Sequence, residues 1–177
     1  MQLENSQNID ITIEKSLETI FGKTAILFAA ATKSSSLINT DEPNKINALS
    51  EFGKNLGIIF QIIDDILDYS SSQKDLGKDI GNDFFEGKIT LPVIFSYLNA
   101  NLQDKKIIKN LLEENLITQE KNQNNFLQML DLLNKYKAFD NSYNLALHYK
   151  NLAINNLSIF KNSVYKDYLV EILNYSF

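Results

Sequence analysis

The chain has 177 residues, of which 44% are hydrophobic and 22% are charged, and these proportions are those of a folded globular protein. It contains no cysteine, which excludes disulfide bonds, thiolate metal sites and thiol nucleophiles. The formal net charge of -5 and the absence of arginine argue against a nucleic-acid partner, which requires a basic surface.

No stretch of the sequence approaches the roughly 20 consecutive apolar residues of a transmembrane helix. The first residues also lack the basic start and apolar run of a secretion signal. We therefore expect a soluble, cytoplasmic protein without a transmembrane segment. At this length one helical core is sufficient, so we expect a single domain that spans residues 1–177.

The apolar residues recur mostly at three- and four-residue spacing, which predicts an all-α fold. A first helix is predicted from Thr12, whose hydroxyl can cap it, to about Lys33, where the serines at 34–36 end it. A second helix is predicted to begin near Pro43, which suits a first helical turn, and to reach Leu67. Isoleucines occupy nearly every side of its later half, which is typical of a helix buried inside a bundle.

Residues 70–87 contain three serines and three glycines among charged residues, which predicts a long loop with a short helical turn. Loops of this length inside compact domains usually have a function. Beyond Pro92 the helical spacing returns. Five further helices, joined by short polar connections, are predicted at residues 93–99, 105–115, 120–136, 141–160 and 164–175.

Three carboxylates stand on the apolar second helix at Asp64, Asp65 and Asp68. In a helix of about 3.6 residues per turn they share a face, with Gln61 one turn earlier. Carboxylates in such surroundings repel one another and are poorly solvated unless cations or a metal neutralise them. Oxygen ligands without sulfur or histidine favour Mg2+, which completes its coordination with water and phosphate oxygens. The pattern therefore indicates a magnesium site for a diphosphate.

Three lysines are placed to supply positive charge to the remaining phosphate oxygens, at Lys23, Lys78 and Lys88. On the residues alone, a solvated acidic helix face with ordinary salt bridges stays open as an alternative, although the surrounding isoleucines disfavour it. The Gly-Lys-Thr at residues 22–24 also suggests a nucleotide-binding loop. However, Leu17 stands where that motif needs its first glycine, and no strand precedes it.

The segment 57–92 closely resembles the second aspartate-rich region of the trans-polyprenyl diphosphate synthases. Phe60 and Gln61 precede the aspartates, and Gly-Lys-Ile-Thr-Leu-Pro follows the loop. Upstream, residues 22–31 resemble the Lys-Thr helix of that family, and the downstream helices are similar in layout. The resemblance implies an antiparallel helical bundle of the isoprenoid synthase type, incomplete here because the chain carries only its C-terminal helices.

The resemblance also implies the roles of the site residues. The three aspartates named above would hold Mg2+. The groups that contact an allylic diphosphate or support its metal site would be Lys23, Thr24, Gln61, Lys78 and Lys88. The implied reaction is ionisation of the allylic diphosphate, attack by the double bond of isopentenyl diphosphate, and loss of a proton. Octaprenyl or a similar quinone side chain is the preferred product class.

Three phenylalanines, Phe60, Phe84 and Phe85, either line an apolar wall around the carbocation or belong to the core, and we prefer the core interpretation. The single histidine, His148, stands at helical spacing and is interpreted as a structural or surface residue.

The sequence departs from the family in lacking its first aspartate cluster, its paired arginines and its isopentenyl diphosphate site. Our hypothesis is that the isolated chain is inactive, as a truncated or split gene product, or that a partner chain supplies the N-terminal half. A homodimer is also expected. Two alternatives are a non-catalytic subunit that pairs with an active synthase and a terpene cyclase relative. The cyclase is disfavoured by the Gly-Lys-Asp and Glu-Gly-Lys triplets of the loop.

Overall fold

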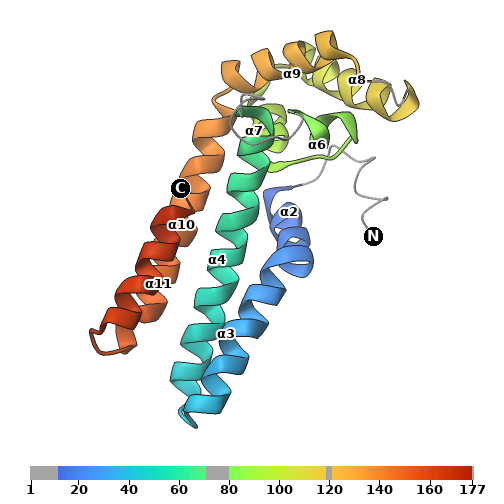
Figure 1. Cartoon of the computed structure of the whole chain (residues 1–177). Coiled ribbons are helices and arrows are strands. Elements are labelled where there is room, and N and C mark those ends of the chain that lie inside the picture. Colours follow the sequence, from blue (N-terminus) through green and yellow to red (C-terminus); the bar gives the residue numbers. More distant parts are fainter. Residues whose placement is uncertain (1–11, 71–79, 119–120, 177) are drawn as a thin grey trace. The chain divides into compact units, whose positions relative to one another are not determined.

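Figure 1 shows the computed structural model of the chain, in which residues 12–70, 80–118 and 121–176 are described. Every regular element among these residues is a helix, which confirms the predicted fold class. The chain divides into two compact units. The first contains described residues of Met1–Ser16 and Asp64–Tyr143, and the second contains those of Leu17–Ile63 and Asn144–Phe177.

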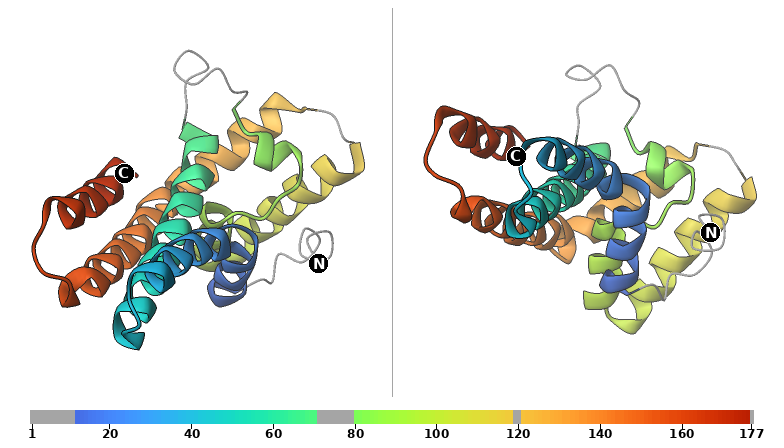
Figure 2. Two further views of the ribbon diagram at one scale, coloured as in Figure 1. Left: turned by 60° about the horizontal axis from the view of Figure 1, so that its bottom comes forward. Right: turned by 90° about the horizontal axis from the view of Figure 1, so that it is seen from below.

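The second unit consists of two antiparallel helix pairs. In the first pair, α2 (Ile13–Ile20) passes through a π-helical turn at Phe21–Ala25 into α3 (Ile26–Asn39), and α4 (Pro43–Ser70) runs back beside α3 (Figure 1). The second pair is formed by α10 (Ala138–Asn156), a 3-10 turn at Leu157–Ile159, and α11 (Val164–Tyr175). Figure 2 shows α10 and α11 side by side in two further views.

The core of the second unit is formed by α4, α10 and α11. Its buried members are Phe52, Ile59, Ala153, Leu157 and Leu173. A polar pair also joins α4 to α10, where Nδ2 of buried Asn55 donates to Oδ1 of partly buried Asn156 at 2.9 Å. Burial of one large apolar side chain stabilises the fold by about 1.5–3 kcal/mol, so these contacts hold α11 and α10 on α4.

Two glycines allow α4 to approach the preceding helix closely. A Cβ on Gly57 would lie 2.6 Å from Cα of Ala25, and a Cβ on Gly53 would collide with the side chain of Thr32 and the backbone of Phe28. Because backbone atoms cannot move aside as the end of a long side chain can, both positions require a residue without a side chain. Gly57 therefore sets the distance between α4 and the π-helical turn, and Gly53 sets the distance between α4 and α3.

The first unit contains the end of α4 and four shorter helices. These are α6 (Asn82–Phe85), α7 (Leu91–Asn99), α8 (Leu102–Thr118) and α9 (Gln123–Lys135). An aromatic cluster joins them, in which the ring of Phe126 lies 6.1 Å from that of Tyr69 and 5.8 Å from that of Phe84. Phe84 is fully buried and Phe85 packs against the same cluster, so both are core residues, as we preferred.

Some helix ends lie where the sequence predicts them, and others do not. Thr12 caps α2 as predicted, because its Oγ1 accepts a 3.3 Å hydrogen bond from the N–H of Lys15. The serines at 34–36, however, do not end the first long helical segment, which continues to Asn39. The hydroxyl of Ser36 donates to the carbonyl of Lys33 at 2.7 Å, so the serine is satisfied inside the helix.

The prediction that α4 leaves almost no solvent face was wrong. Ile59 and Ile62 are fully buried, but Phe60 is 52% exposed and Leu67 is 43% exposed. Together with exposed Asp64, these side chains form a stripe at the three- and four-residue spacing of one helix face.

None of the helices in the described ranges is long and apolar enough to cross a membrane.

Candidate functional site

The candidate site follows one face of α4. Gln61, Asp64, Asp65 and Asp68 lie on this continuous helix, at the spacing that places them on a shared face. Their environments differ, because Asp65 is only 6% exposed, Asp68 is half-buried and Asp64 is exposed. The acidic face thus passes from solvent into the protein within one helical turn.

Asp68 is held by the segment that follows the long loop. Its Oδ2 accepts a 3.0 Å hydrogen bond from the N–H of Asp83, and its backbone carbonyl accepts one of 2.8 Å from the N–H of Gly81. Gly81 has a φ of 76°, where a side chain would be strained and would strike Phe126. The glycine therefore allows the chain to turn back onto the end of α4.

The carboxyl group of Asp68 is partly buried and lies near other negatively charged side chains. Partial burial raises its pKa, the backbone N–H of Asp83 acts in the opposite direction, and the charges of Asp83 and Asp64 raise the pKa further. The net result is a raised pKa. A cation beside this carboxylate would be stabilised by the same charges.

Lys88 is linked to Asp68 through Asp83. The Nζ atom of Lys88 lies 2.8 Å from Oδ1 of Asp83 and 2.7 Å from Oε2 of Glu86. Partial burial lowers the pKa of Lys88, but the hydrogen bonds to Asp83 and Glu86 outweigh it and the pKa is raised. The sequence prediction included Lys88 and missed Asp83. The sequence feature that could have indicated the Asp83–Lys88 ion pair is a carboxylate five residues before a lysine, with a glycine turn between them.

Two other predicted site residues, Thr24 and Gln61, meet in the second unit. The hydroxyl of Thr24 donates a 2.8 Å hydrogen bond to Oε1 of Gln61, across 37 residues of sequence. Thr24 belongs to the π-helical turn Phe21–Ala25, an irregularity that is common at functional sites. Lys23 is exposed on the same turn, whereas Ala25 is fully buried. The structure thus brings together two of the predicted site residues.

An aromatic pair, of which one ring is exposed and one is partly buried, lies next to these two residues. The ring centroids of Phe28 and Phe60 are 5.7 Å apart, and Phe28 is one helical turn after Thr24 while Phe60 precedes Gln61. Because Phe60 is more than half exposed, the core interpretation was wrong for this residue.

His148 is exposed, with its ring centroid 5.5 Å from that of Tyr149.

The predicted metal site can be compared with the structure only in part. Lys78 lies in residues 71–79, outside the described residues. Within the described ranges, no group of three or more histidine, cysteine, aspartate or glutamate side chains is arranged to hold a metal ion by itself. The carboxylates of α4 are nevertheless hard oxygen donors. Partial burial first, and then the charges of Asp83 and Asp64, raise the pKa of Asp68, and a cation would stabilise a carboxylate whose ionised form is disfavoured in this way. Both features fit Mg2+ that takes its other ligands from phosphate and water.

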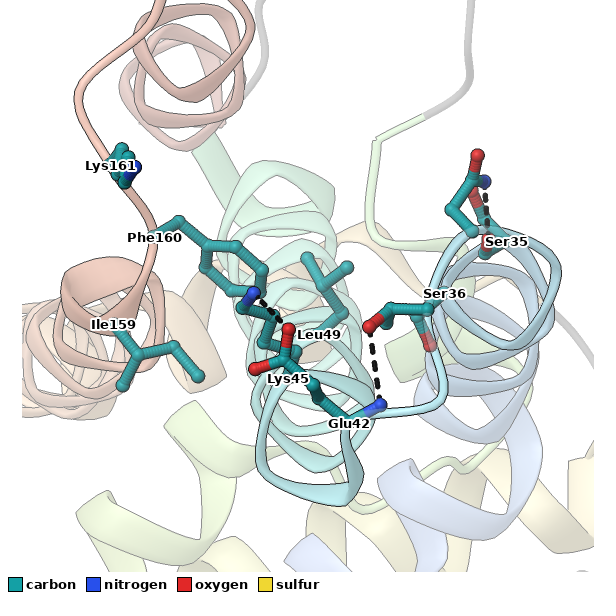
Figure 3. A pocket seen from close by; sticks show the side chains of 10 residues that line it. Ser35, Ser36, Glu42, Lys45, Leu49, Ile159, Phe160 and Lys161 are labelled. Carbon is teal, nitrogen blue, oxygen red and sulfur yellow. Dashed lines mark hydrogen bonds and ion pairs between the residues drawn. The ribbon is translucent and has the colours of Figure 1, made fainter.

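A pocket lies elsewhere in the second unit, with a volume of about 600 Å3. It is formed by the end of α3, the start of α4 and the segment around Phe160, and Lys45 and Glu42 form an ion pair at its edge (Figure 3). None of the predicted site residues lines this pocket, so it does not belong to the candidate site.

The all-helical fold and the acidic face of α4 define a protein of the isoprenoid synthase type. A family model described as polyprenyl synthetase matches residues 1–130. The chain belongs to the polyprenyl synthetase family, and the resemblance inferred from residues 57–92 is confirmed.

Curated relatives give the same result. The chain is 31% identical over 172 residues to a short chain isoprenyl diphosphate synthase of Methanothermobacter thermautotrophicus, a match of 96% of this chain and 50% of the relative. It is 36% identical over 158 residues to a geranylgeranyl diphosphate synthase of Sulfolobus acidocaldarius, covering 89% and 46% of the two chains. The chain therefore spans about half the length of these relatives.

Solved structures show the same fold. A decaprenyl diphosphate synthase from Rhodobacter capsulatus matches with a TM-score of 0.88 and 30% identity, over 99% of this chain and 53% of that chain. A polyprenyl synthase from Caulobacter crescentus, solved in complex with calcium and isoprenyl diphosphate, matches with a TM-score of 0.89 and 30% identity, over 99% and 52%.

Proposed function

We propose that the chain provides the diphosphate-binding half of a polyprenyl diphosphate synthase, which condenses isopentenyl diphosphate with an allylic diphosphate. The family match and the relatives named as isoprenyl diphosphate synthases support a prenyl transferase. The observation that carries the proposal is the hydrogen bond between Thr24 and Gln61. It joins two separate segments that the sequence assigned to the same diphosphate.

In this proposal Asp64, Asp65 and Asp68 would hold Mg2+. When bound, Mg2+ would neutralise the negative charge that develops on the departing diphosphate. The Caulobacter crescentus protein was solved with calcium and isoprenyl diphosphate, which supports the use of a divalent cation with an isoprenoid diphosphate. Within the chain itself, the N–H of Asp83 orients the carboxylate of Asp68.

The remaining site residues would bind and orient the diphosphate. Lys23, Lys78 and Lys88 would place positive charge near the phosphate oxygens, where negative charge increases as the ester bond breaks. The hydrogen bond from Thr24 to Oε1 holds the side chain of Gln61, and the amide nitrogen of Gln61 would be its donor group for a phosphate oxygen.

Apolar side chains would protect the reacting carbon from water. The ring of partly buried Phe28 lies one helical turn from Thr24, and the exposed ring of Phe60 belongs to the residue before Gln61. An allylic cation beside these rings would be shielded from water, which would otherwise capture it. Octaprenyl or a similar product and a cytoplasmic location stay predictions.

Calorimetry tests the diphosphate site directly. Geranyl diphosphate is titrated into the chain with and without Mg2+, and the wild type is compared with Asp64→Ala. Asp41→Ala, which removes an exposed aspartate between α3 and α4, is the matched control. We expect binding that requires Mg2+, is at least tenfold weaker in Asp64→Ala, and is unchanged in Asp41→Ala. Binding that is equal in all three proteins would contradict the proposal.

An activity assay tests whether the chain needs a polypeptide that corresponds to the other half of its relatives. Because the chain spans about half of its relatives, we expect no elongation of labelled isopentenyl diphosphate by the chain alone. Activity is expected when a polypeptide corresponding to the other half is added. Magnesium-dependent elongation by the chain alone would refute the expectation that the isolated chain is inactive.

A second candidate is a non-catalytic subunit that pairs with an active synthase. The two candidates differ in the effect of Asp64→Ala on the assembled pair. A loss of activity supports a catalytic role for this chain, whereas unchanged activity supports the subunit.

A further inference from the structure

The short helix α6 ends in a turn that fixes the backbone around Lys88. The N–H of Gly87 donates to the carbonyl of Phe84 at 3.0 Å, and the N–H of Lys88 donates to the carbonyl of Asp83 at 2.9 Å. Gly87 has a φ of 68°, in the left-handed region. Two such hydrogen bonds around a left-handed glycine are the Schellman motif, which ends many helices. The motif therefore brings Lys88 and Asp83 together at the end of α6.

The side chains at these two positions form an ion pair. In many Schellman motifs the corresponding side chains make an apolar contact instead. Here Nζ of Lys88 lies 2.8 Å from Oδ1 of Asp83 and 2.7 Å from Oε2 of Glu86. A lysine ammonium has three N–H donors, so these contacts leave a third donor for another acceptor. Because 43% of the Lys88 side chain is exposed, a ligand can reach this donor.

One side chain of α8, that of Asn115, holds the backbone of this turn. Its Nδ2 donates a 3.1 Å hydrogen bond to the carbonyl of Phe84, and both residues are buried. The carbonyl can only accept, which fixes the orientation of the Asn115 amide. The next residue, Leu116, lies against Gly87 so closely that a Cβ on the glycine would be 2.4 Å from Cδ2 of the leucine. Neighbouring residues of α8 thus contact the turn at both Phe84 and Gly87.

The turn needs contacts of this kind because α6 cannot hold its geometry alone. It has four residues, and a helix of one turn is unstable without tertiary contacts. At its start, the carboxylate of Asp68 accepts from the N–H of Asp83. At its end, Asn115 bonds the carbonyl of Phe84. The amide of Asn115 therefore supports the part of the turn that leads directly into Lys88.

Packing alone does not account for an asparagine at this position. Asn115 is only 2% exposed, and its Oδ1 has no hydrogen-bond partner among the described residues. A buried acceptor without a partner lowers stability, and a leucine of similar shape would avoid this loss. What the leucine could not supply is the donor for the carbonyl of Phe84. The asparagine therefore fits a role in fixing the turn.

We propose that Asn115 is a positioning residue for the diphosphate site, where it holds the turn that presents the amine of Lys88 to a phosphate oxygen. It acts through Lys88 and makes no contact with the diphosphate itself. The inference rests on the proposed function, in which Lys88 binds the diphosphate.

Hydrogen exchange measured by NMR tests the effect on the turn without any ligand. In Asn115→Leu and Asn115→Ala, we expect the amides of Gly87 and Lys88 to exchange at least tenfold faster than in the wild type. The rates are compared with the slowest amides of the same protein, which report global unfolding. Ser96→Ala is the matched control, because buried Ser96 donates its hydroxyl to a backbone carbonyl of the same unit at 3.2 Å. It should leave the relative rates unchanged. Equal rates in the wild type and both Asn115 variants overturn the proposal.

Calorimetry with geranyl diphosphate and Mg2+ tests the link to Lys88. Lys88→Met should weaken binding at least tenfold, and Asn115→Leu at least fivefold. The double variant should bind within threefold of Lys88→Met, because Asn115 then has no amine to position. A purely structural role predicts instead that the two losses multiply. Circular dichroism of each variant verifies that the helices are retained.

The outcomes of the titrations separate this inference from the proposed function. Unchanged affinity in Asn115→Leu, or losses that multiply in the double variant, overturns the role of Asn115 while the wild type still binds. An equal loss of affinity in Ser96→Ala also overturns it, because the effect would then follow from stability in general. A wild type that binds no geranyl diphosphate overturns the proposed function, and the role of Asn115 with it.

Discussion

The hydroxyl of Thr24 donates to Oε1 of Gln61 over 2.8 Å, and this contact fastens the π-helical turn to α4. Both side chains are partly buried, so the bond is protected from competition by water. Lys23 lies next to Thr24 on the same turn. The position of this lysine relative to Gln61 therefore depends on a side-chain pair that is 37 residues apart in sequence.

A double-mutant cycle measures the strength of this pair. Thr24→Val and Gln61→Leu should each lower the free energy of unfolding by about 1 kcal/mol, because a partly buried partner loses its hydrogen bond. The coupling energy between them should be about 0.5–1.5 kcal/mol in urea denaturation. Thr24→Ser retains the hydroxyl and is expected to retain the coupling. A coupling near zero would show that the pair contributes nothing to the attachment of the turn.

The close approach of α4 to the π-helical turn gives a second prediction. Gly57→Ala places a Cβ 2.6 Å from Cα of Ala25, so the helices must separate, and stability should fall by about 1–3 kcal/mol. Gly22→Ala is the matched control, since a Cβ there has no neighbour within 4 Å. Its stability should be unchanged or higher by up to about 1 kcal/mol, because alanine favours the helix. Equal losses in the two variants would contradict the steric explanation.

The sequence predicts those features of the fold that local chemistry determines. Pro43 begins α4 as predicted, because its fixed φ suits a first helical turn. α11 matches residues 164–175 at both ends, and the hydroxyl of Ser163 caps it by accepting from the N–H of Lys166 at 3.3 Å. The π-helical turn was not predicted, because its position is set by the contact of Ala25 with Gly57 on another helix.

In the candidate site too, the sequence predicts what local helical spacing determines and misses what contacts between distant segments determine. The shared face of Gln61 and Asp68 follows from helical periodicity alone, and the structure confirms that both lie on one helix. The bond from Asp83 to Asp68 was missed, because it depends on how the loop returns to α4 and on the left-handed backbone of Gly81. The exposure of Phe60 was missed for a similar reason, since periodicity does not show which neighbours cover a face.

Removal of the charge on Asp68 is expected to raise the stability of the free protein and to weaken ligand binding. Its folded-state pKa is raised, so its contribution favours folding below the unfolded pKa and is lost as the pH rises through the folded value. At neutral pH the ionised carboxylate is therefore unfavourable, and Asp68→Asn should raise the melting temperature without ligand. With Mg2+ and geranyl diphosphate at 100 times the dissociation constant, the wild type should gain about 2.7 kcal/mol and the variant much less.

Thermal unfolding with and without these ligands measures both effects on Asp68. Asp131→Asn, which changes an exposed aspartate of α9, is the control and should leave both values as in the wild type. A variant that is less stable than the wild type without ligand, or that gains as much from the ligand, would contradict the assignment of Asp68.

A network around Asp104 predicts a loss of stability in acid. Asp104 is only 7% exposed, and its Oδ2 accepts hydrogen bonds of 2.5 Å from both Nζ of Lys135 and the hydroxyl of Tyr136. These bonds hold the pKa of Asp104 below its usual value. The stabilisation is therefore present above the unfolded pKa of about 3.9 and is lost as the pH falls through the lower folded value.

Asp104→Asn separates this contribution from the general effect of acid. The variant should be less stable than the wild type at pH 7, and the difference should shrink as the pH falls below about 4, because the wild type then loses its charged partner too. Urea denaturation at pH 7, 5 and 3 measures the difference. Asp140→Asn, at an exposed position on α10, should show no such convergence. A difference that stays constant over this range would mean that the Asp104 charge does not stabilise the first unit.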